Sequence, residues 1–306
     1  MSKTLIPSEL RVTTRDDKGR KFIEVVAAAY DKAGLSEEEA QHVNEATGLK
    51  ELIDKHIADN RTPNQFANEE VVSNYGYLSG YKPKSLAEQI ARLKELFPGL
   101  GDANQDLLLE IEKGEVKLPK HAEGWFAIPN WLKNPQIFGS TYFGSTYSEA
   151  LLKVLKIIKQ TRSGKFYNYR EDQLDEKRLR QSARTQKFFL ELSEVQGNPD
   201  ILIVPAQFGL RHRGRSIRRA REVFLANEFG FGAFAVGIML LTHPERLQNV
   251  NDLWVDCAGD EFAPGADGCF DRAPCFGFSD GRLGFGASTV DDVVDDYGSA
   301  SGFLPQ

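Results

Sequence analysis

The sequence contains few cysteines, no long apolar run and no hydrophobic leader. Its 306 residues include three cysteines without a closely spaced pair, which disfavours a disulfide-stabilised secreted domain. The most apolar segment, residues 229–241, holds three glycines and is shorter than the roughly 20 residues that span a bilayer. The first residues lack the apolar core of a signal peptide. We therefore expect a soluble, cytoplasmic protein that does not enter a membrane.

Several short motifs of known chemistry are also missing. The chain has no G-x-x-x-x-G-K-[ST] phosphate loop and no G-x-S-x-G nucleophile elbow. Gly230, Gly232 and Ala235 match the loose dinucleotide pattern G-x-G-x-x-A, but an arginine-rich run precedes them where a strand is required, so close packing is the favoured interpretation. The residues that could ligate zinc lack the short spacing of structural zinc sites: His243, Cys257, Cys269 and Cys275.

The spacing of apolar residues indicates helices in the first part of the chain. Ser36 and Ser85 each stand three residues before a glutamate, a capping-box pattern that predicts helix starts. Apolar residues recur at helical spacing before, between and after these two caps. Helices are expected over these ranges: 20–33, 36–47, 49–58, 86–97 and 104–113.

From residue 118 onward, proline and short apolar runs replace this pattern. Prolines and aromatic residues over 118–135 predict an ordered, extended segment. Helices are predicted over 147–160 and 173–195, and strands at four apolar runs: 201–204, 253–256, 275–278 and 282–285. The sequence thus predicts a mixed α/β (α+β) fold. A mostly helical N-terminal region (1–117) is followed by an α/β C-terminal domain (118–306) with a small sheet and packed helices.

Residues 201–243 contain the largest concentration of candidate ligand-binding side chains in the chain. A buried-strand signal is followed by the run 211–221, which we call the arginine unit, and then by the apolar segment. The guanidinium group pairs bidentately with phosphate oxygens. A nucleic-acid or other phosphate ligand is therefore one prediction for these residues: Arg211, Arg213, Arg215, Arg218 and Arg219.

The distribution of charge leaves a second interpretation open. Residues 159–221 hold fifteen basic and seven acidic side chains, whereas residues 251–306 hold two basic and eleven acidic ones. Because neighbouring like charges repel, the arginine unit needs an anionic complement. That complement is either a ligand, the acidic C-terminal region folded back onto it, or a protein partner. The net charge of −6 disfavours a general nucleic-acid coat without excluding a local phosphate site.

Three carboxylates that follow an apolar run suggest another chemistry. Asp256, Asp260 and Glu261 stand just after the strand predicted at 253–256. Carboxylate oxygens are the ligands that Mg²⁺ prefers, and a divalent metal at this place would serve an enzyme acting on phosphate esters. Ion pairs with the arginine unit or capping of a loop are the alternative roles for the same side chains.

Aromatic residues add a third set of candidates. Aromatic rings next to a basic surface can stack unpaired nucleobases, although packing in a core is the commoner role of such residues. The run 166–170 is the most promising part of this set. The full set is Trp125, Tyr142, Tyr147, Tyr167 and Tyr169.

Five runs of the chain together resemble a group of uncharacterised bacterial proteins without an assigned activity. The runs are 124–129, 166–170, 204–209, 211–221 and 256–261. The resemblance implies a bacterial setting and no particular chemistry. Three hypotheses therefore remain: a module that binds nucleic acid or another phosphate ligand, a metal-dependent enzyme, and a structural or interaction protein whose arginine unit is neutralised internally.

Overall fold

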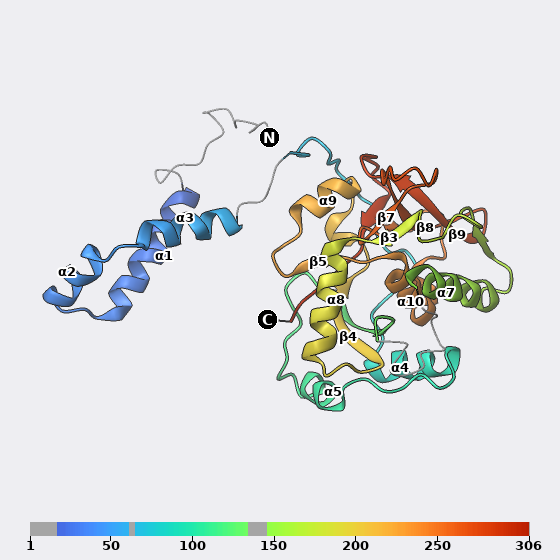
Figure 1. Cartoon of the computed structure of the whole chain (residues 1–306), viewed down its shortest axis with the longest axis horizontal. Coiled ribbons are helices and arrows are strands. Elements are labelled where there is room, and N and C mark those ends of the chain that lie inside the picture. Colours follow the sequence, from blue (N-terminus) through green and yellow to red (C-terminus); the bar gives the residue numbers. More distant parts are fainter. Residues whose placement is uncertain (1–16, 61–64, 134–145, 306) are drawn as a thin grey trace. The chain divides into compact units, whose positions relative to one another are not determined.

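The computed structural model describes residues 17–60, 65–133 and 146–305 (Figure 1). The chain divides into two compact units, residues 1–65 and 66–306. Helices and two sheets make it a mixed α/β protein, as the sequence predicts. The sequence-based boundary after residue 117 lies inside the second unit. Within the described ranges, no helix is long and apolar enough to cross a bilayer.

The first unit consists of three helices: α1 (Asp17–Ala33), α2 (Glu37–Glu45) and α3 (Leu49–Asn60). The capping box at the start of α2 is present, since Ser36 Oγ accepts from Glu39 N at 3.3 Å and Ser36 N donates to Glu39 Oε2 at 2.8 Å. No side chain described between residues 19 and 57 is buried. The first unit therefore has no core of its own in the described residues.

A four-stranded antiparallel sheet forms one part of the second unit. Its order is β1 (Gly124–Pro129), β4 (Ile201–Gln207), β11 (Ser301–Phe303) and β5 (Glu228–Gly230). All seven residues of β4 are buried. Gln89 of α4 (Leu86–Leu96) covers the outer edge of β1, because its side chain accepts from Ala127 N at 3.0 Å and donates to Trp125 O at 2.9 Å. Such an edge is closed to further strands.

A seven-stranded sheet forms the other part. The main path is β10 (Tyr297–Ser299), β6 (Trp254–Asp256), β8 (Arg272–Ser279), β7 (Asp260–Phe262) and β3 (Leu179–Gln181). On its other edge β8 pairs with β9 (Arg282–Thr289), which pairs with β2 (Phe166–Asn168). Asp280 and Gly281 both have positive φ, as the tight turn of the predicted hairpin requires.

One predicted helix is wrong in its first half. The range 173–195 contains strand β3 and only then helix α8 (Ala183–Val195), which starts after the N-cap Ser182. Leu179 and Gln181 are buried and alternate with exposed Arg180, so β3 pairs with β7. The charged residues over 175–191 are spaced as on a helix, so the sequence did not reveal the three-residue alternation of buried and exposed side chains in β3. The remaining elements are α5 (Gln105–Glu112), α7 (Tyr147–Thr161), η2 (Leu210–His212), α9 (Ile217–Val223), α10 (Ala233–Thr242) and η3 (Pro244–Arg246).

Helix α10 lies at the centre of the core, and every one of its ten residues is buried. It packs against α7, where a Cβ on Gly237 would come within 2.7 Å of Val154. Its N-cap, Gly232, has no side chain, and Asp260 of β7 caps the helix from outside by accepting from Ala233 N at 2.7 Å. A carboxyl oxygen from another element thus satisfies an N–H group that the helix cannot satisfy itself.

Replacement of Gly232 by alanine tests this packing. The new Cβ would overlap both Asp260 Oδ1 and Tyr147 Oη, and overpacking of this kind costs about 1–3 kcal/mol. Gly232→Ala is expected to lower the free energy of unfolding by that amount in urea titrations. The control is Gly76→Ala, because no atom lies within 4 Å of a Cβ at Gly76. Equal loss in both variants would contradict the account.

Candidate functional site

The arginine unit lies against residues 66–73, which we call the glutamate segment. Val71 N donates to Gly214 O at 2.7 Å, so the two backbones are in direct contact. Gly214 has a φ of +72°, and a Cβ there would overlap the carbonyl oxygen of Val71. Glycine is required at this position, because only it combines this backbone conformation with so close an approach.

Two glutamates of this segment hold three of the candidate arginines. Arg218 Nε donates to the oxygens of Glu69 at 2.9 and 2.8 Å. Glu70 pairs with Arg215 at 3.2 Å and also with Arg219. The hydrogen bond from Arg218 lowers the pKa of Glu69, so this carboxylate is ionised at neutral pH. The repulsion among the arginines is offset within the fold.

The most buried ion pair of the unit is centred on Glu228, which is fully buried. Its carboxylate accepts from Arg211 Nε at 3.1 and 3.2 Å and from Ser301 Oγ at 2.7 Å, and His212 Nε2 lies 2.7 Å away. Burial lowers the pKa of His212, so its ring is neutral at pH 7. Because Arg215 can only donate, and lies 3.1 Å from Nδ1, the ring hydrogen is on Nε2 and points at Glu228.

The acidic region 251–306 was one of three complements that the sequence left open for the arginine unit. In the part of the chain that the structure describes, the carboxylates that form ion pairs with the unit belong to the glutamate segment, α9 and β5. Arg213 is exposed and donates to the Tyr75 carbonyl at 2.7 Å. Arg221 is held by two main-chain carbonyls, at 2.9 and 2.6 Å. The arginine unit therefore stabilises the contact between the elements that carry these glutamates.

The three carboxylates predicted to bind a metal occupy separate environments. Asp260 is buried and accepts from Tyr147 Oη at 2.8 and 2.7 Å. Glu261 pairs with Arg180 at 2.6 Å. Asp256 is buried in β6, and in the part of the chain that the structure describes its Oδ1 has no hydrogen-bond partner. No three His, Cys, Asp or Glu side chains of the described ranges come together as a metal site.

The aromatic candidates also separate. Tyr147 is buried and serves Asp260, and Tyr142 lies outside the described residues. Tyr167 and Tyr169 are 45% and 50% exposed, so part of each ring is accessible to solvent. These two residues are therefore the ones still available to bind a planar ligand.

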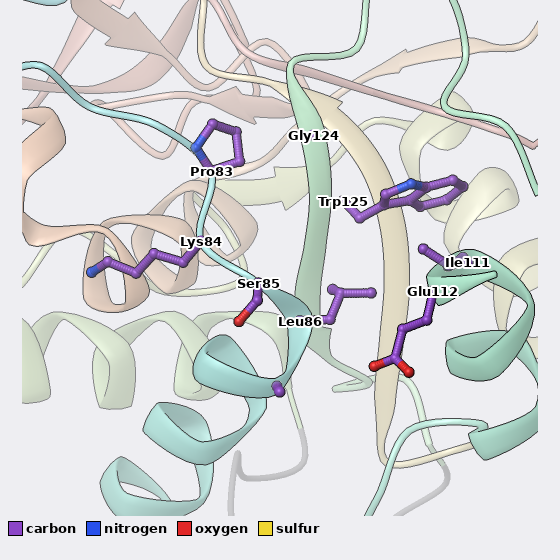
Figure 2. A pocket seen from close by; sticks show the side chains of 9 residues that line it. Pro83, Lys84, Ser85, Leu86, Ile111, Glu112, Gly124 and Trp125 are labelled. Atoms are coloured by element: carbon purple, nitrogen blue, oxygen red, sulfur yellow. The ribbon is translucent and has the colours of Figure 1, made fainter. Parts of the chain in front are cut away.

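Trp125 lines an open hollow of about 360 Å³ beside α4, α5 and β1 (Figure 2). Leu86 and Ile111 form the apolar walls with it, while Lys84 extends away from Trp125 and donates to the Thr242 carbonyl at 2.8 Å. Apolar walls of this kind accept an apolar group. Their chemistry does not select one ligand over another.

A row of side chains crosses five strands of the seven-stranded sheet on the face that carries Tyr167. Tyr297 pairs with Trp254, and the Trp254 ring lies on Gly277, where a Cβ would overlap it. Gly277 pairs with Gly284, and Gly284 pairs with Tyr167. Directly paired residues point to the same side of a sheet. Aromatic residues therefore lie on both sides of Gly277 and Gly284 on this face.

Tyr169 and Arg282 complete this surface. A Cβ on Gly284 would lie 3.3 Å from the Tyr169 ring, and the ring centres of Tyr167 and Tyr169 are 4.6 Å apart. The Arg282 guanidinium lies 4.8 Å from the centre of the Tyr167 ring, and its Nε has no hydrogen-bond partner among the described residues. We call this surface the aromatic face, and it consists of Tyr167, Tyr169, Trp254, Arg282 and Tyr297.

Three residues of the aromatic face are not among the candidates predicted from the sequence, namely Trp254, Arg282 and Tyr297. A signal for them was present, because Gly277 and Gly284 stand inside the predicted strands 275–278 and 282–285. Glycine in a strand often marks the close approach of another group. What the sequence did not reveal is the strand pairing that places these rings beside the glycines.

Comparison of the chain with protein-family models, with curated proteins and with solved structures finds no match. The resemblance to a group of bacterial proteins therefore stays a prediction.

Loss of the Glu228 charge tests how much the ion pair between Arg211 and Glu228 stabilises the fold. Burial alone raises the pKa of Glu228, but the His212 hydrogen bond and the surrounding charges lower it to about 2. The stabilisation is therefore present above the unfolded pKa of about 4.5 and is lost as the pH falls through about 2, and linkage puts it on the order of 3 kcal/mol. Glu228→Gln should lose about this much stability in urea titrations at pH 7, whereas exposed Glu110→Gln should not. A stable Glu228→Gln protein would contradict the assignment.

Asp256 predicts the opposite dependence on pH. Burial raises its pKa to about 8, so the folded protein retains a proton that the unfolded chain releases near pH 4. Stability from this group falls as the pH rises from about 4 to about 8. Asp256→Asn, which stays neutral, is expected to gain melting temperature relative to the wild type as the pH increases from 5 to 8. Exposed Asp280→Asn serves as the control, and a constant difference across this range would refute the prediction.

Proposed function

We propose that the protein binds single-stranded nucleic acid by stacking unpaired bases on the aromatic face. The observation that carries the proposal is the pair of half-exposed rings, Tyr167 and Tyr169, held on a sheet beside Trp254 and Tyr297. Stacking of a base on an aromatic side chain contributes about 1–3 kcal/mol per base and tolerates any base. Rigid presentation matters, because rings fixed by strand pairing lose little freedom when a base binds.

The charges next to the rings suit a nucleotide backbone. Arg282 sits over one ring, and Lys165, just before β2, is exposed. Both are placed to pair with phosphate once a base has stacked. Exposed Glu171 and Asp280, close to them in the sequence, weaken this attraction. We therefore expect moderate affinity, in which stacking contributes more than the ionic contacts.

The arginine unit is a poorer candidate for the same role. At Arg218 a phosphate would compete with Glu69, which already pairs with it. A phosphate that replaced Glu228 on Arg211 would leave Glu228 as a buried charge without this partner. Breaking a buried ion pair in this way costs about 3–5 kcal/mol. That cost consumes most of what a new phosphate contact supplies.

The binding proposal is tested by fluorescence anisotropy with a fluorescein-labelled 15-nucleotide thymidine strand at low salt. The wild-type protein should bind it and should bind the corresponding duplex more weakly, because paired bases cannot stack on the rings. Tyr169→Ala is expected to weaken binding about 5- to 100-fold, the loss of one stacked base. Tyr169→Phe should bind normally, because the ring is retained.

Two further variants separate stacking from damage to the fold. Leu190→Ala removes a side chain that is 49% exposed on α8, and should leave binding unchanged. Arg282→Gln should lower the slope of log affinity against log salt by about one ionic contact. If the labelled strand does not bind at low salt, or if oligosaccharides bind instead and depend on Tyr169, the nucleic-acid proposal is refuted.

A further inference from the structure

Two arginines of the second unit lack a carboxylate partner. Arg170 lies just after β2, and Arg272 is the first residue of β8. Within the described ranges, no ion pair joins either guanidinium group to an aspartate or glutamate, whereas Arg178 pairs with Asp175. Both residues are partly exposed, so solvent and solutes can reach them.

The surroundings of Arg170 hold its side chain without neutralising it. Asn168 Oδ1 accepts a hydrogen bond from Arg170 N at 2.8 Å, which turns the chain at the end of β2. The guanidinium group donates to Gln173 Oε1 and to the Ala287 carbonyl, both at 3.4 Å. Both acceptors are neutral, and both distances exceed the usual range of about 2.7–3.2 Å. These contacts are weak enough for a stronger acceptor to replace them.

Strand pairing brings Arg272 to the same place. Arg272 pairs directly with Phe262 of β7, so the two side chains point to the same side of the sheet. The Arg170 guanidinium carbon lies 5.6 Å from the centre of the same Phe262 ring. Burial, and next the positive charge of Arg272, lower the pKa of Arg170. Two like charges therefore lie close together beside one buried ring.

Both guanidinium groups have a donor to spare. Nε of Arg170 and Nε of Arg272 are buried, and neither has a hydrogen-bond partner among the described residues. The acidic residues next to them in the sequence are Glu171, Asp172 and Asp271, and all three are exposed to solvent. Exposed carboxylates reduce the local positive potential, but they do not satisfy a buried donor.

We propose that Arg170 and Arg272 together bind a phosphate group. The planar fork of each guanidinium group matches the spacing of phosphate oxygens, and one phosphate can accept from both forks. Such an anion would offset the repulsion between the two charges and would accept from the spare donors. In contrast to a phosphate at Arg218, it has no carboxylate to displace in the part of the chain that the structure describes.

This inference deepens the proposed function and rests on it for one of two sources of the phosphate. Arg170 directly follows Tyr169, so the backbone of a strand stacked on Tyr169 is one source. A free phosphate compound is the other source. Inorganic phosphate tests the site without any nucleic acid, so the two proposals can fail separately.

Thermal melting of the full-length protein in inorganic phosphate, compared with chloride at equal ionic strength, tests the site. The wild type should melt about 3–6 °C higher in phosphate at roughly ten times its Kd, as expected for a ligand that binds only the folded state. Arg170→Gln and Arg272→Gln should each lose most of this shift. The control is Lys177→Gln, which removes the same charge from an exposed side chain and should keep the shift.

Each variant is compared with itself in chloride, so a general loss of stability does not count. Phosphate also stabilises proteins by exclusion from their surface, and this effect is common to all variants. If a glutamine variant does not melt cooperatively, Arg272→Lys replaces it, because lysine keeps the charge and loses the fork, and should at least halve the shift. A wild type that gains nothing in phosphate, or a shift that survives these substitutions, would overturn the proposal.

The labelled thymidine strand distinguishes the two sources. If its backbone supplies the phosphate, Arg170→Gln should weaken binding and lower the slope of log affinity against log salt by about one ionic contact. If Arg170→Gln loses the melting shift but binds the strand normally, the site takes a free phosphate compound. A strand that does not bind, together with an intact melting shift, refutes the proposed function and supports this site, whereas stacking without a melting shift does the reverse.

Discussion

The buried carboxylate of Glu228 imposes the constraint on which the central part of the fold depends. An ionised carboxylate cannot stay in a protein interior unless several donors surround it. These donors come from two places, because Arg211 and His212 lie in η2 after β4 and Ser301 lies in β11, while the carboxylate itself belongs to Glu228 at the start of β5. Three elements that are far apart in the sequence therefore have to meet at one atom group. The glutamate segment repeats the arrangement one layer further out, where the carboxylates are only partly covered.

A buried network of this kind adds specificity of arrangement more than net stability. Ion pairs that leave water recover through their mutual attraction roughly what desolvation costs. Loss of only one partner of such a pair, however, leaves the other as an unpaired buried charge. Alternative packings that separate the two partners are therefore disfavoured. An arginine-rich run therefore fits a protein of net charge −6 without an external anion, because carboxylates of the same fold pair with it. The arginine unit is the place where two other segments, residues 66–73 and β5, contact residues 211–221.

The sequence was most informative where the cause of structure is local. The capping boxes at Ser36 and Ser85 are present, the β8–β9 hairpin turns at Asp280 and Gly281, and the apolar segment after residue 229 supplies the buried helix α10. It was least informative where the cause is a distant pairing. Nothing near Glu69 or Glu70 indicates that residues 66–73 lie along the arginine unit, some 150 positions later. The aromatic face was hidden for the same reason, because Tyr167 and Tyr297 share a surface only through the registers of five strands.

The two surfaces differ in what a ligand would have to displace, and this difference decides between them. The arginine side chains already pair with carboxylates of the protein. Replacing a carboxylate by a phosphate exchanges one anionic partner for another and therefore adds little binding free energy. Tyr167 and Tyr169 are about half exposed to solvent. A planar base placed on the exposed part of these rings displaces solvent from apolar surface, which is favourable at about 25 cal/mol per Å², and it shares the Tyr167 ring with Arg282. An acidic protein can therefore bind a polyanion at one place when stacking, rather than overall charge, supplies most of the attraction.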